Sequence, residues 1–321
     1  MKCLCCGRPI KETAADELKN GWHSGCIKKF FGTKELPDID ISDEILKALA
    51  AESTSKGFTV PGVQKKLSLH LSAERGEKAR LTLVNYPTGY IIKPQTDEYP
   101  ALPEAEYLTM RMAEKAGIKT VPFALVKMGD GKLAYITKRI DRAGKTENIQ
   151  MLAMEDFCQL DGRLTEDKYK GSYERCSKII NDFSSQPGLD NAELFLRVVF
   201  SFAVGNSDMH LKNFSLIETA ENSGSFVLSK AYDMLPVNTV NPADSEQFAL
   251  TMNGKKRNLH RGDFLKFADT CHINRSAAEK LINKIVSSED VFIEECKSSY
   301  LPDELKENLI ALIQSRMQML R

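Results

Sequence analysis

Residues 205–214 read Gly-Asn-Ser-Asp-Met-His-Leu-Lys-Asn-Phe and carry the side chains best suited to chemistry. Asp208 and Asn213 are five positions apart, so one short loop can hold both at a fixed separation. A carboxylate can meet a substrate hydroxyl, and an Asn side chain can reach a metal ion that is bound to phosphates. Asp233, twenty residues further along, adds a second carboxylate after a short apolar run. This set predicts the transfer of a phosphoryl group to a hydroxyl.

Lys93 and Glu106 are the matching candidates in the first half of the chain. Lys93 ends a strand-like run and could steady the α- and β-phosphates of a nucleotide, while Glu106, on the following helix, could pair with it. Residues 58–66 precede them and are expected to include a loop that covers the phosphates. The loop, Lys, Glu, Asp-x4-Asn and second Asp follow one another in the order found in protein kinases.

Each of these residues also has a plainer interpretation. A Lys such as Lys93 at a strand end is usually a solvated edge residue, and a lone Asp such as Asp208 is often a turn or cap residue. His210 is more often a structural histidine than a general base. The shared order and the matching element types favour phosphoryl transfer over these alternatives.

The elements that must position these residues change character near residue 150. Strand-like runs fill most of residues 53–140, and one helix, 102–116, interrupts them. The expected strands cover residues 66–71, 79–85, 90–93, 123–128 and 133–140, with a hairpin turn at 129–131. The second half is expected to contain a buried helix at 191–204 capped by Asp190, a short strand at 226–228 and three amphipathic helices within 261–321.

These patterns predict an α+β fold with two lobes and a cleft between them. A Cys/His-rich segment and linker, 1–50, would lead into a short helix at 43–52. The strand-rich lobe would cover 51–155, and the helical lobe 156–321.

The composition narrows the class of protein further. The 321 residues contain 44 basic and 44 acidic side chains, which argues against a broad cationic face for nucleic acid. An apolar content of 42% excludes a disordered or collagen-like chain. The longest apolar run, near 194–204, is interrupted by Arg197 and is too short to span a membrane, and the N-terminus lacks a signal-peptide pattern. We therefore expect a cytoplasmic protein without a membrane partner.

The eight cysteines divide into an N-terminal group of four and four that are scattered. The scattered set is expected to be buried thiols in a reducing compartment. Cys3, Cys6, His23 and Cys26 form two ligand pairs, C-x2-C and H-x2-C, which suit a tetrahedral structural Zn²⁺. Cys5 could replace Cys3 or Cys6. The alternative is a set of reduced surface thiols near a frayed terminus.

The sequence resembles the HipA family of bacterial toxin serine/threonine kinases over about residues 55–321. The matching segments are 62–66 (Gly-Val-Gln-Lys-Lys), 90–94 (Tyr-Ile-Ile-Lys-Pro), 106–110 (Glu-Tyr-Leu-Thr-Met), 139–142 (Arg-Ile-Asp-Arg), 155–159 (Glu-Asp-Phe-Cys-Gln), 205–214 and 231–233 (Ala-Tyr-Asp). The segment that contains Asp208 is highly specific for the family, whereas 62–66 and 155–159 are moderately so.

This resemblance implies a two-lobed kinase-like fold that uses ATP and Mg²⁺. The nucleotide contacts that it implies come from Val63, Gln64, Lys66, Lys93, Glu106, Tyr232 and the backbone of Glu155 and Phe157. The catalytic residues that it implies are Asp208, which would orient or deprotonate the substrate hydroxyl, His210, which would shape the loop, and Lys93. Asn213 and Asp233 would bind the metal.

The resemblance also implies regulation and partners. Family members can phosphorylate a Ser of their own phosphate loop, and Thr59 stands at the matching position here. A phosphate there would repel the phosphates of the nucleotide and switch the enzyme off. The implied partners are a protein substrate of the aminoacyl-tRNA synthetase type and a helix-turn-helix antitoxin, with no direct binding of nucleic acid.

The chain departs from full-length members before the phosphate loop, where they carry a strand-rich subdomain. It resembles shorter, split versions, in which that subdomain is a small separate protein and a second partner. A catalytically silent kinase-like module that regulates a partner or binds DNA is the alternative function. The intact Lys93, Asp208, Asn213 and Asp233 speak against it.

Overall fold

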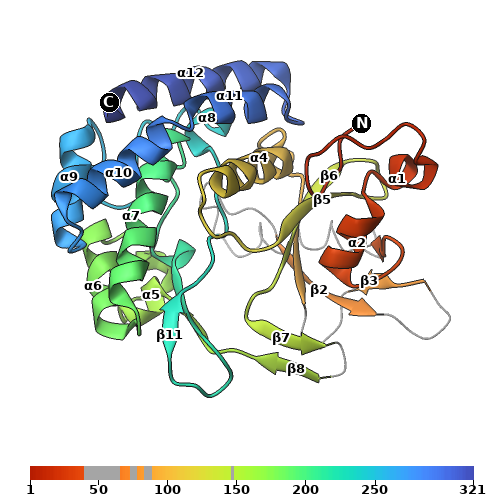
Figure 1. The fold of residues 1–321 in the computed structure, drawn as a ribbon, viewed down its shortest axis with the longest axis horizontal. Coiled ribbons are helices and arrows are strands. Elements are labelled where there is room, and N and C mark those ends of the chain that lie inside the picture. Colours follow the sequence, from red (N-terminus) through yellow and green to blue (C-terminus); the bar gives the residue numbers. More distant parts are fainter. Residues whose placement is uncertain (40–65, 73–77, 83–88, 146–147) are drawn as a thin grey trace. The chain divides into compact units, whose positions relative to one another are not determined.

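The computed structural model describes residues 1–39, 66–72, 78–82, 89–145 and 148–321. The described chain divides into two compact units (Figure 1). The first contains Met1–Tyr107 and Val121–Ile149, and the second contains Leu108–Thr120 and Gln150–Arg321. Thr59, Val63, Gln64 and the helix expected at 43–52 lie outside the described residues. The division at 1–50, 51–155 and 156–321 stays a prediction.

The first unit is built on a sheet with the strand order β1-β3-β2-β4-β6-β5. Its strands are β1 (Asp38–Ile39), β2 (Leu67–Ser72), β3 (Arg80–Thr82), β4 (Tyr90–Pro94), β5 (Phe123–Lys127) and β6 (Leu133–Lys138). All neighbouring pairs are antiparallel except β1 and β3. The hairpin expected at 129–131 joins β5 and β6, and Gly131 adopts the positive φ that this turn requires.

Helix α4 (Leu102–Lys115) follows β4 and begins in the first unit. Its apolar side chains recur at helical spacing, and Gly117, with a φ of 77°, follows its end as expected. Strands β7 (Arg142–Lys145) and β8 (Asn148–Met151) form a two-stranded sheet that the sequence patterns did not indicate.

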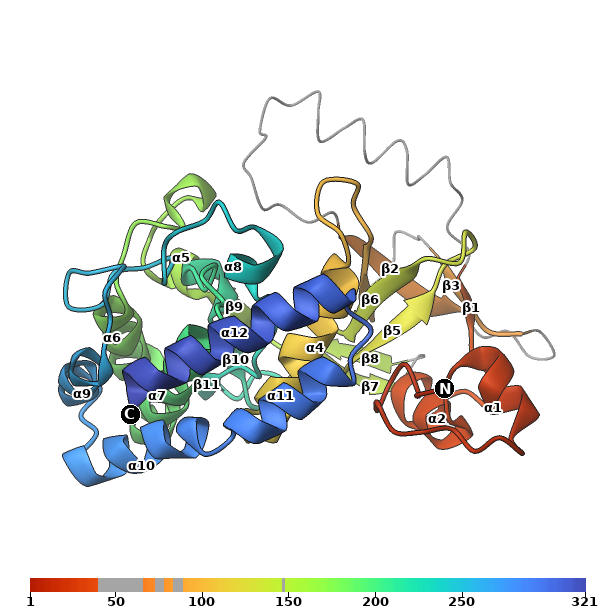
Figure 2. The ribbon, with the colours of Figure 1, turned by 90° about the horizontal axis from the view of Figure 1, so that it is seen from above.

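The N-terminal module, residues 1–39, belongs to the same unit. Its helices α1 (Ala15–Asn20) and α2 (Ser24–Phe31) lie beside the sheet, in red in Figures 1 and 2. Trp22 is fully buried, and Ile27 and Phe30 of helix α2 are nearly so. This module therefore contributes apolar core to the strand-rich unit.

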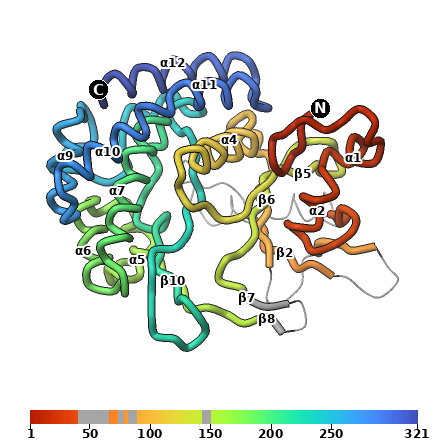
Figure 3. The backbone as a smooth tube through the Cα atoms, viewed as in Figure 1, coloured from red at the N-terminus to blue at the C-terminus, as the bar shows by residue number. Residues whose placement is uncertain are grey.

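The second unit is mainly helical, as expected, and carries one small antiparallel sheet in the order β11-β10-β9. Its strands are β9 (Met154–Asp156), β10 (Ser215–Glu218) and β11 (Phe226–Leu228). Its helices are α5 (Phe157–Leu160), η1 (Thr165–Asp167), α6 (Tyr173–Phe183), α7 (Pro187–Ala203), η2 (Leu211–Asn213), α8 (Val237–Val240), α9 (Arg261–Thr270), α10 (Arg275–Val286), α11 (Glu289–Lys297) and α12 (Asp303–Leu320). Figure 3 traces this unit from α6 and α7 through β10 to the C-terminal helices.

Helix α7 is the centre of this unit, because nearly all its side chains from Leu194 to Ala203 are buried. Even Arg197 is only 2% exposed, and its guanidinium donates hydrogen bonds to Glu193 and to the carbonyl of Ser229. The helix thereby fixes both the loop that follows it and the segment that leads to Asp233.

Two expectations for the second unit were wrong in detail. Helix α7 begins at Pro187, so Asp190 lies inside its first turn and is not its cap. A proline is well suited to the first turn of a helix, and the Asp190 carboxylate instead accepts hydrogen bonds from Ser184 and from the backbone of Leu228. Residues 261–321 form four helices rather than three.

None of the helices in the described parts of the chain is long and apolar enough to cross a membrane.

Candidate active site and metal centre

The loop 204–214 leaves the end of α7 through a glycine that the fold requires. Gly205 has a φ of 69°, and a Cβ atom there would lie 2.8 Å from Leu312 of α12. An L-residue would therefore be strained and would also collide with the neighbouring helix. This turn ends helix α7 and begins the segment that leads to Asp208.

Asp208 is held by a residue far away in the sequence. The Tyr169 hydroxyl donates a hydrogen bond of 2.7 Å to Asp208 Oδ1. Burial raises the pKa of Asp208 to about 6, while the Tyr169 bond opposes this shift and the negative charge of Asp233 adds to it. Asp208 therefore lies near the negative charge of Asp233, and its pKa suits a group that accepts a proton near neutral pH.

Asn213 completes the loop as a short brace. Its side-chain nitrogen donates a 2.8 Å hydrogen bond to the backbone carbonyl of Asp208, and the residue is 5% exposed. The brace uses the amide nitrogen, whereas a cation would bind the amide oxygen. The structure therefore brings the expected pair of Asp208 and Asn213 together on one tightly held loop.

Asp233 follows the small sheet with a left-handed backbone, at a φ of 58°. Asp is one of the few residues that adopt this conformation readily, and such positions are enriched at functional sites. The preceding Ala231 is fixed by a backbone hydrogen bond to Lys119.

His210 lies in the same loop and supports Tyr169. Its ring packs edge-on against the Tyr169 ring, with centroids 5.0 Å apart, and it is 6% exposed. Burial and the nearby Lys168 charge lower the pKa of His210 to about 4, so the imidazole is neutral at physiological pH. This geometry agrees with a role in shaping the loop.

Further contacts tie the loop to its surroundings. Lys212 forms a 2.7 Å ion pair with Asp156, and the Tyr232 hydroxyl donates a 3.0 Å hydrogen bond to the Lys212 carbonyl. Ser207 donates a 2.6 Å hydrogen bond to Asp244. In this structure Tyr232 thus braces the loop; its contact with a nucleotide stays a prediction.

The segment that was expected to meet adenine is engaged within the fold. Glu155 pairs with Leu216 in the small sheet. The Phe157 N–H donates to the carbonyl of Phe214, and the Phe157 carbonyl accepts from the N–H of Asp161. A nucleotide that accepted a hydrogen bond from the Phe157 N–H would have to replace the bond to Phe214, so the adenine contacts of Glu155 and Phe157 also stay predictions.

The first unit carries the second group of expected residues. Lys93 on β4 and Glu106 on α4 form a buried ion pair of 2.7 Å, with side chains that are 6% and 1% exposed. The Lys93 ammonium also lies 5.5 Å from the centre of the Tyr135 ring on the neighbouring strand β6. Lys93 is therefore not a solvated edge residue, and the pairing expected from the sequence is present. Lys66, by contrast, is exposed and lies directly before β2.

Several residues of the site gave no sequence signal. Tyr169 and Lys168 lie about forty positions before Asp208, in a loop without a recognisable motif. Lys168 lies 4.9 Å over the Tyr169 ring, and its carbonyl accepts a hydrogen bond from the N–H of Leu211. Asp244 follows a turn, and no sequence motif marks it either.

The donor set in the second unit fits a hard cation. Asn213 and Asp233 offer oxygen ligands, which Mg²⁺ prefers. The negative charges of Asp233 and Asp244 raise the pKa of Asp208 in the isolated chain, so a cation held there would offset an existing repulsion.

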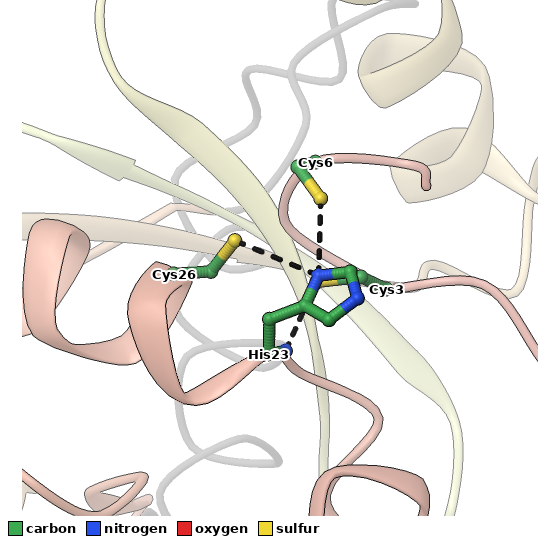
Figure 4. A group of neighbouring side chains, drawn as sticks. All are labelled: Cys3, Cys6, His23 and Cys26. Carbon is green, nitrogen blue, oxygen red and sulfur yellow. Dashed lines mark hydrogen bonds between the residues drawn. The ribbon is translucent and has the colours of Figure 1, made fainter. Parts of the chain in front are cut away.

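The N-terminal module contains a compact group of metal-ligand side chains. One donor atom from each of Cys3, Cys6, His23 and Cys26 lies within 4.8 Å of the others. Figure 4 shows Cys6, from the first turn, and Cys26, from helix α2, pointing toward the His23 ring. Cys5 is outside this group, so the geometry favours Cys3 and Cys6 over the alternative with Cys5, and the ligand set itself stays a prediction.

The distances in this group suit a tetrahedral ion. Nδ1 of His23 lies 3.3 Å from Sγ of Cys6 and 3.9 Å from Sγ of Cys26. Ligand atoms around tetrahedral zinc are about 3.6 to 3.8 Å apart, given bonds of roughly 2.0 to 2.3 Å. Nε2 of His23 lies 3.1 Å from the carbonyl of Pro9, which can only accept, so Nε2 carries the proton and Nδ1 keeps its lone pair for a metal.

Comparison with known proteins identifies the class to which this fold and site belong. A sequence profile of the HipA-like C-terminal domain matches residues 58–291, which is most of the chain. The chain therefore belongs to the HipA-like C-terminal domain family. The N-terminal module lies outside the matched residues.

Curated relatives are similar in sequence and carry kinase names. A Haemophilus influenzae protein named "Putative kinase" is 25% identical over 350 residues, covering 99% of this chain and 97% of its own length. "Putative kinase Y4dM" of Sinorhizobium fredii is 32% identical over 207 residues, which cover 60% of this chain and 48% of that protein. The chain thus spans about half the length of this second relative.

Two solved structures share the fold. HipA in the Shewanella oneidensis MR-1 toxin–antitoxin complex of HipA, HipB and operator DNA matches with a TM-score of 0.67 and 20% identity. That match covers 82% of this chain and 66% of the Shewanella chain. The Helicobacter pylori proinflammatory kinase CtkA matches with a TM-score of 0.55 and 17% identity, covering 79% of this chain and 93% of CtkA. The expected α+β kinase-like fold, strand-rich and then helical, is thereby confirmed.

Proposed function

We propose that the chain is an ATP-dependent serine/threonine protein kinase of the HipA type. The observation that carries this proposal is the setting of Asp208, whose carboxylate is hydrogen-bonded to Tyr169 and whose backbone is braced by Asn213. A partly buried carboxylate with a raised pKa, beside a second carboxylate and an amide, is the donor set that phosphoryl transfer to a hydroxyl needs. The kinase names of the relatives support the same reaction class.

In the proposed reaction, Asp208 accepts the proton of a Ser or Thr hydroxyl while that oxygen forms a bond to the γ-phosphorus of ATP. The bond from the γ-phosphorus to its bridging oxygen breaks, and ADP leaves. Lys93 would hold the α- and β-phosphates, with its charge and position maintained by Glu106. Mg²⁺, held by Asn213 and Asp233, would supply positive charge to the phosphates. His210 would act through Tyr169 rather than on the substrate.

Nucleotide binding by calorimetry tests the first half of this proposal. Wild type should bind a non-hydrolysable ATP analogue in the presence of Mg²⁺, and Asp233→Asn should weaken that binding about tenfold or more. Asp182→Asn is the matched control, because it removes an exposed carboxylate of helix α6 that forms an ion pair with Lys178 of the same helix. Absence of binding for every nucleotide would favour the catalytically silent module instead.

We infer that the biological setting is a toxin–antitoxin system. The support is the fold shared with HipA, which is solved in a complex with HipB and operator DNA. The proposed partners are a helix-turn-helix antitoxin and a small separate protein of the kind that corresponds to the N-terminal subdomain of longer family members, with an aminoacyl-tRNA synthetase as the proposed type of substrate. Phosphoproteomics of the host with wild type and with Asp208→Asn would identify the substrate as the phosphosite that only wild type produces.

Autophosphorylation at Thr59 is a further part of the proposal. Mass spectrometry of protein incubated with ATP should find phosphate on Thr59 or on a nearby Ser, and the modified protein should bind nucleotide less tightly. Unmodified peptide from this segment after prolonged incubation would contradict it.

We also propose that Cys3, Cys6, His23 and Cys26 hold a structural Zn²⁺. The support is the mutual distance of their donor atoms and the orientation of His23. Metal analysis should find one zinc per chain, lost in Cys6→Ser and retained in Cys5→Ser. The second variant is a matched control, because Cys5 lies in the same turn but outside the ligand group. A zinc-free wild type would refute this site.

A further inference from the structure

The N-terminal module contacts both elements that carry the Lys93–Glu106 pair. The Tyr107 hydroxyl donates a hydrogen bond of 3.3 Å to the carbonyl of Cys5, and Tyr107 is the residue next to Glu106 in helix α4. The Tyr90 hydroxyl donates a hydrogen bond of 3.2 Å to the carbonyl of Phe30, and Tyr90 begins the strand that ends near Lys93. Both tyrosines are buried, with 5% or less of their surface exposed.

Aromatic packing extends the second of these contacts. The Tyr90 ring lies 5.9 Å from the Phe30 ring and 5.5 Å from the Phe31 ring, measured between centroids. Both phenylalanines in turn lie within 5.6 Å of Trp22. Strand β4 is thus joined to the apolar core of the module.

The module also completes the edge strand β5. The Leu125 N–H donates a 2.9 Å hydrogen bond to the carbonyl of Leu4, and the Leu125 carbonyl accepts one of 3.1 Å from the Trp22 indole. Leu125 pairs with Tyr135 on β6, and Tyr135 pairs with Lys93 on β4. The module therefore reaches the neighbourhood of Lys93 from the sheet edge as well.

These contacts come from the residues that surround the metal-ligand group. Leu4 and Cys5 lie between the ligands Cys3 and Cys6, Trp22 precedes the ligand His23, and Phe30 lies near the end of the helix that carries the ligand Cys26. The module shares the apolar core of the strand-rich unit but has few apolar residues of its own, and a structural metal adds free energy of folding to a segment of this size. The carbonyls of Cys5 and Phe30 thus belong to the segment that a metal bound to this group would stabilise.

We propose that the N-terminal metal centre controls nucleotide binding by clamping β4 and α4 so that Lys93 and Glu106 pair. With the metal bound, the module fixes both elements through Tyr90 and Tyr107. Without it, the module loosens, the lysine loses its fixed position and nucleotide affinity falls. Because coupling between two binding sites is reciprocal, a bound nucleotide must also tighten the hold on the metal. This inference rests on the proposed role of Lys93 toward phosphates.

The test compares zinc-loaded protein with protein stripped by a zinc-selective chelator in excess Mg²⁺. Calorimetry with a non-hydrolysable ATP analogue should show at least a tenfold loss of affinity on stripping, which added Zn²⁺ reverses. Trp22 is the only tryptophan in the sequence and is fully buried, so its fluorescence reports on the module directly and should shift to the red when the metal leaves. Far-UV circular dichroism of the stripped protein should keep the helical signal of the second unit, which separates loosening of the module from global unfolding.

Three outcomes distinguish the ideas. A loss of affinity that zinc restores, with helical signal retained, supports the clamp. Equal affinity with and without zinc, despite a red shift of Trp22, overturns the clamp and leaves the proposed kinase intact. Absence of nucleotide binding in the zinc-loaded protein overturns the proposed function itself.

The variant Tyr107→Phe tests the contact between the N-terminal module and helix α4 without removing a metal ligand. It deletes the hydroxyl that bonds to Cys5 but keeps the four donor residues, Lys93 and Glu106. Zinc content should stay at one per chain, nucleotide affinity should fall about three- to tenfold, and the affinity should depend less on zinc than in wild type. Tyr99→Phe is the matched control, since it removes a phenol of the same unit that lies beside Glu98, and it should behave as wild type. An unchanged dependence on zinc in Tyr107→Phe would exclude this path.

Discussion

The Tyr169 hydroxyl donates a 2.7 Å hydrogen bond to Oδ1 of Asp208. This bond fixes the orientation of the carboxylate, and the neutral His210 ring and the Lys168 ammonium hold the Tyr169 ring in turn. Asp208 is thus positioned partly by Tyr169, a residue outside its own loop, and its basicity depends on that hydrogen bond.

The pH dependence of catalysis should reflect Asp208. Its pKa is raised to about 6 by burial, and only the ionised form can accept a proton, so kcat/KM should fall below about pH 6, by roughly tenfold per pH unit. The titration of His210 should not change kcat/KM between pH 5 and 8, because its pKa is lowered to about 4. Steady-state kinetics from pH 5 to 8 provide the check, and a flat profile down to pH 5 would be inconsistent with this assignment.

In the variant Tyr169→Phe, the fall of kcat/KM on the acid side of the pH profile (the acid limb) should begin at a higher pH than in wild type. The Tyr169 hydrogen bond favours the charged carboxylate, so its loss leaves burial and the Asp233 charge to raise the pKa of Asp208 further. Activity should drop most at low pH and recover toward wild type near pH 8. The same pH series of kcat/KM measures the shift.

Tyr173→Phe is the matched control for this series. Its hydroxyl donates to the carbonyl of Met209, in the same loop but not to the carboxylate. This variant should lose stability without moving the acid limb. Equal shifts in both variants would mean that the effect comes from the loop as a whole.

The roles of Asp208 and Asn213 in the loop could be predicted from the sequence, but the residues that hold the loop in place could not. Asp208 and Asn213 are close in the chain, so their spacing alone restricts how they can lie. Tyr169 meets Asp208 only because the tertiary path of residues 161–171 brings it there, and no periodic pattern records that path. Thr59 lies outside the described residues, so its role stays a prediction.

Separate stability and binding effects are expected at the Lys93–Glu106 pair. Glu106→Gln removes the carboxylate that neutralises a buried lysine, which should lower the free energy of unfolding by about 3 to 5 kcal/mol. The double variant Lys93→Met with Glu106→Leu should recover most of this loss but bind no nucleotide. Urea unfolding and calorimetry measure the two effects, and nucleotide binding by the double variant would show that Lys93 does not hold phosphates.

Gly205→Ala should destabilise the protein more than Gly254→Ala. Both glycines have a positive φ, which costs an alanine about 1 to 2 kcal/mol, but a Cβ at position 254 meets no atom within 4 Å. At position 205 it would lie 2.8 Å from Leu312, which should add about 1 to 3 kcal/mol. Urea unfolding of the two variants measures the difference, and equal losses would show that α12 yields to the added methyl group.

The remaining sequence predictions also differ in whether they depend on residues close in the chain or on contacts between distant residues. Helix α4 follows from local periodicity, and the pairing of Lys93 with Glu106 was expected from the order of these residues in protein kinases. The start of α7 was misjudged because Asp190 is a good cap residue by type, whereas its carboxylate is used by Leu228, thirty-eight positions away. The choice of Cys3 and Cys6 over Cys5 likewise needed the fold of the first turn.

The most direct test of the central claim is transfer of label from [γ-³²P]ATP to protein by wild type and by Asp208→Asn. The amide keeps the shape of the side chain and removes a partly buried charge whose pKa is raised, so the variant should fold at least as well as wild type above about pH 4. The account predicts Mg²⁺-dependent labelling of Ser or Thr by wild type and a loss of at least a hundredfold in the variant, as expected for a general base. Labelling that persists unchanged in Asp208→Asn would contradict it.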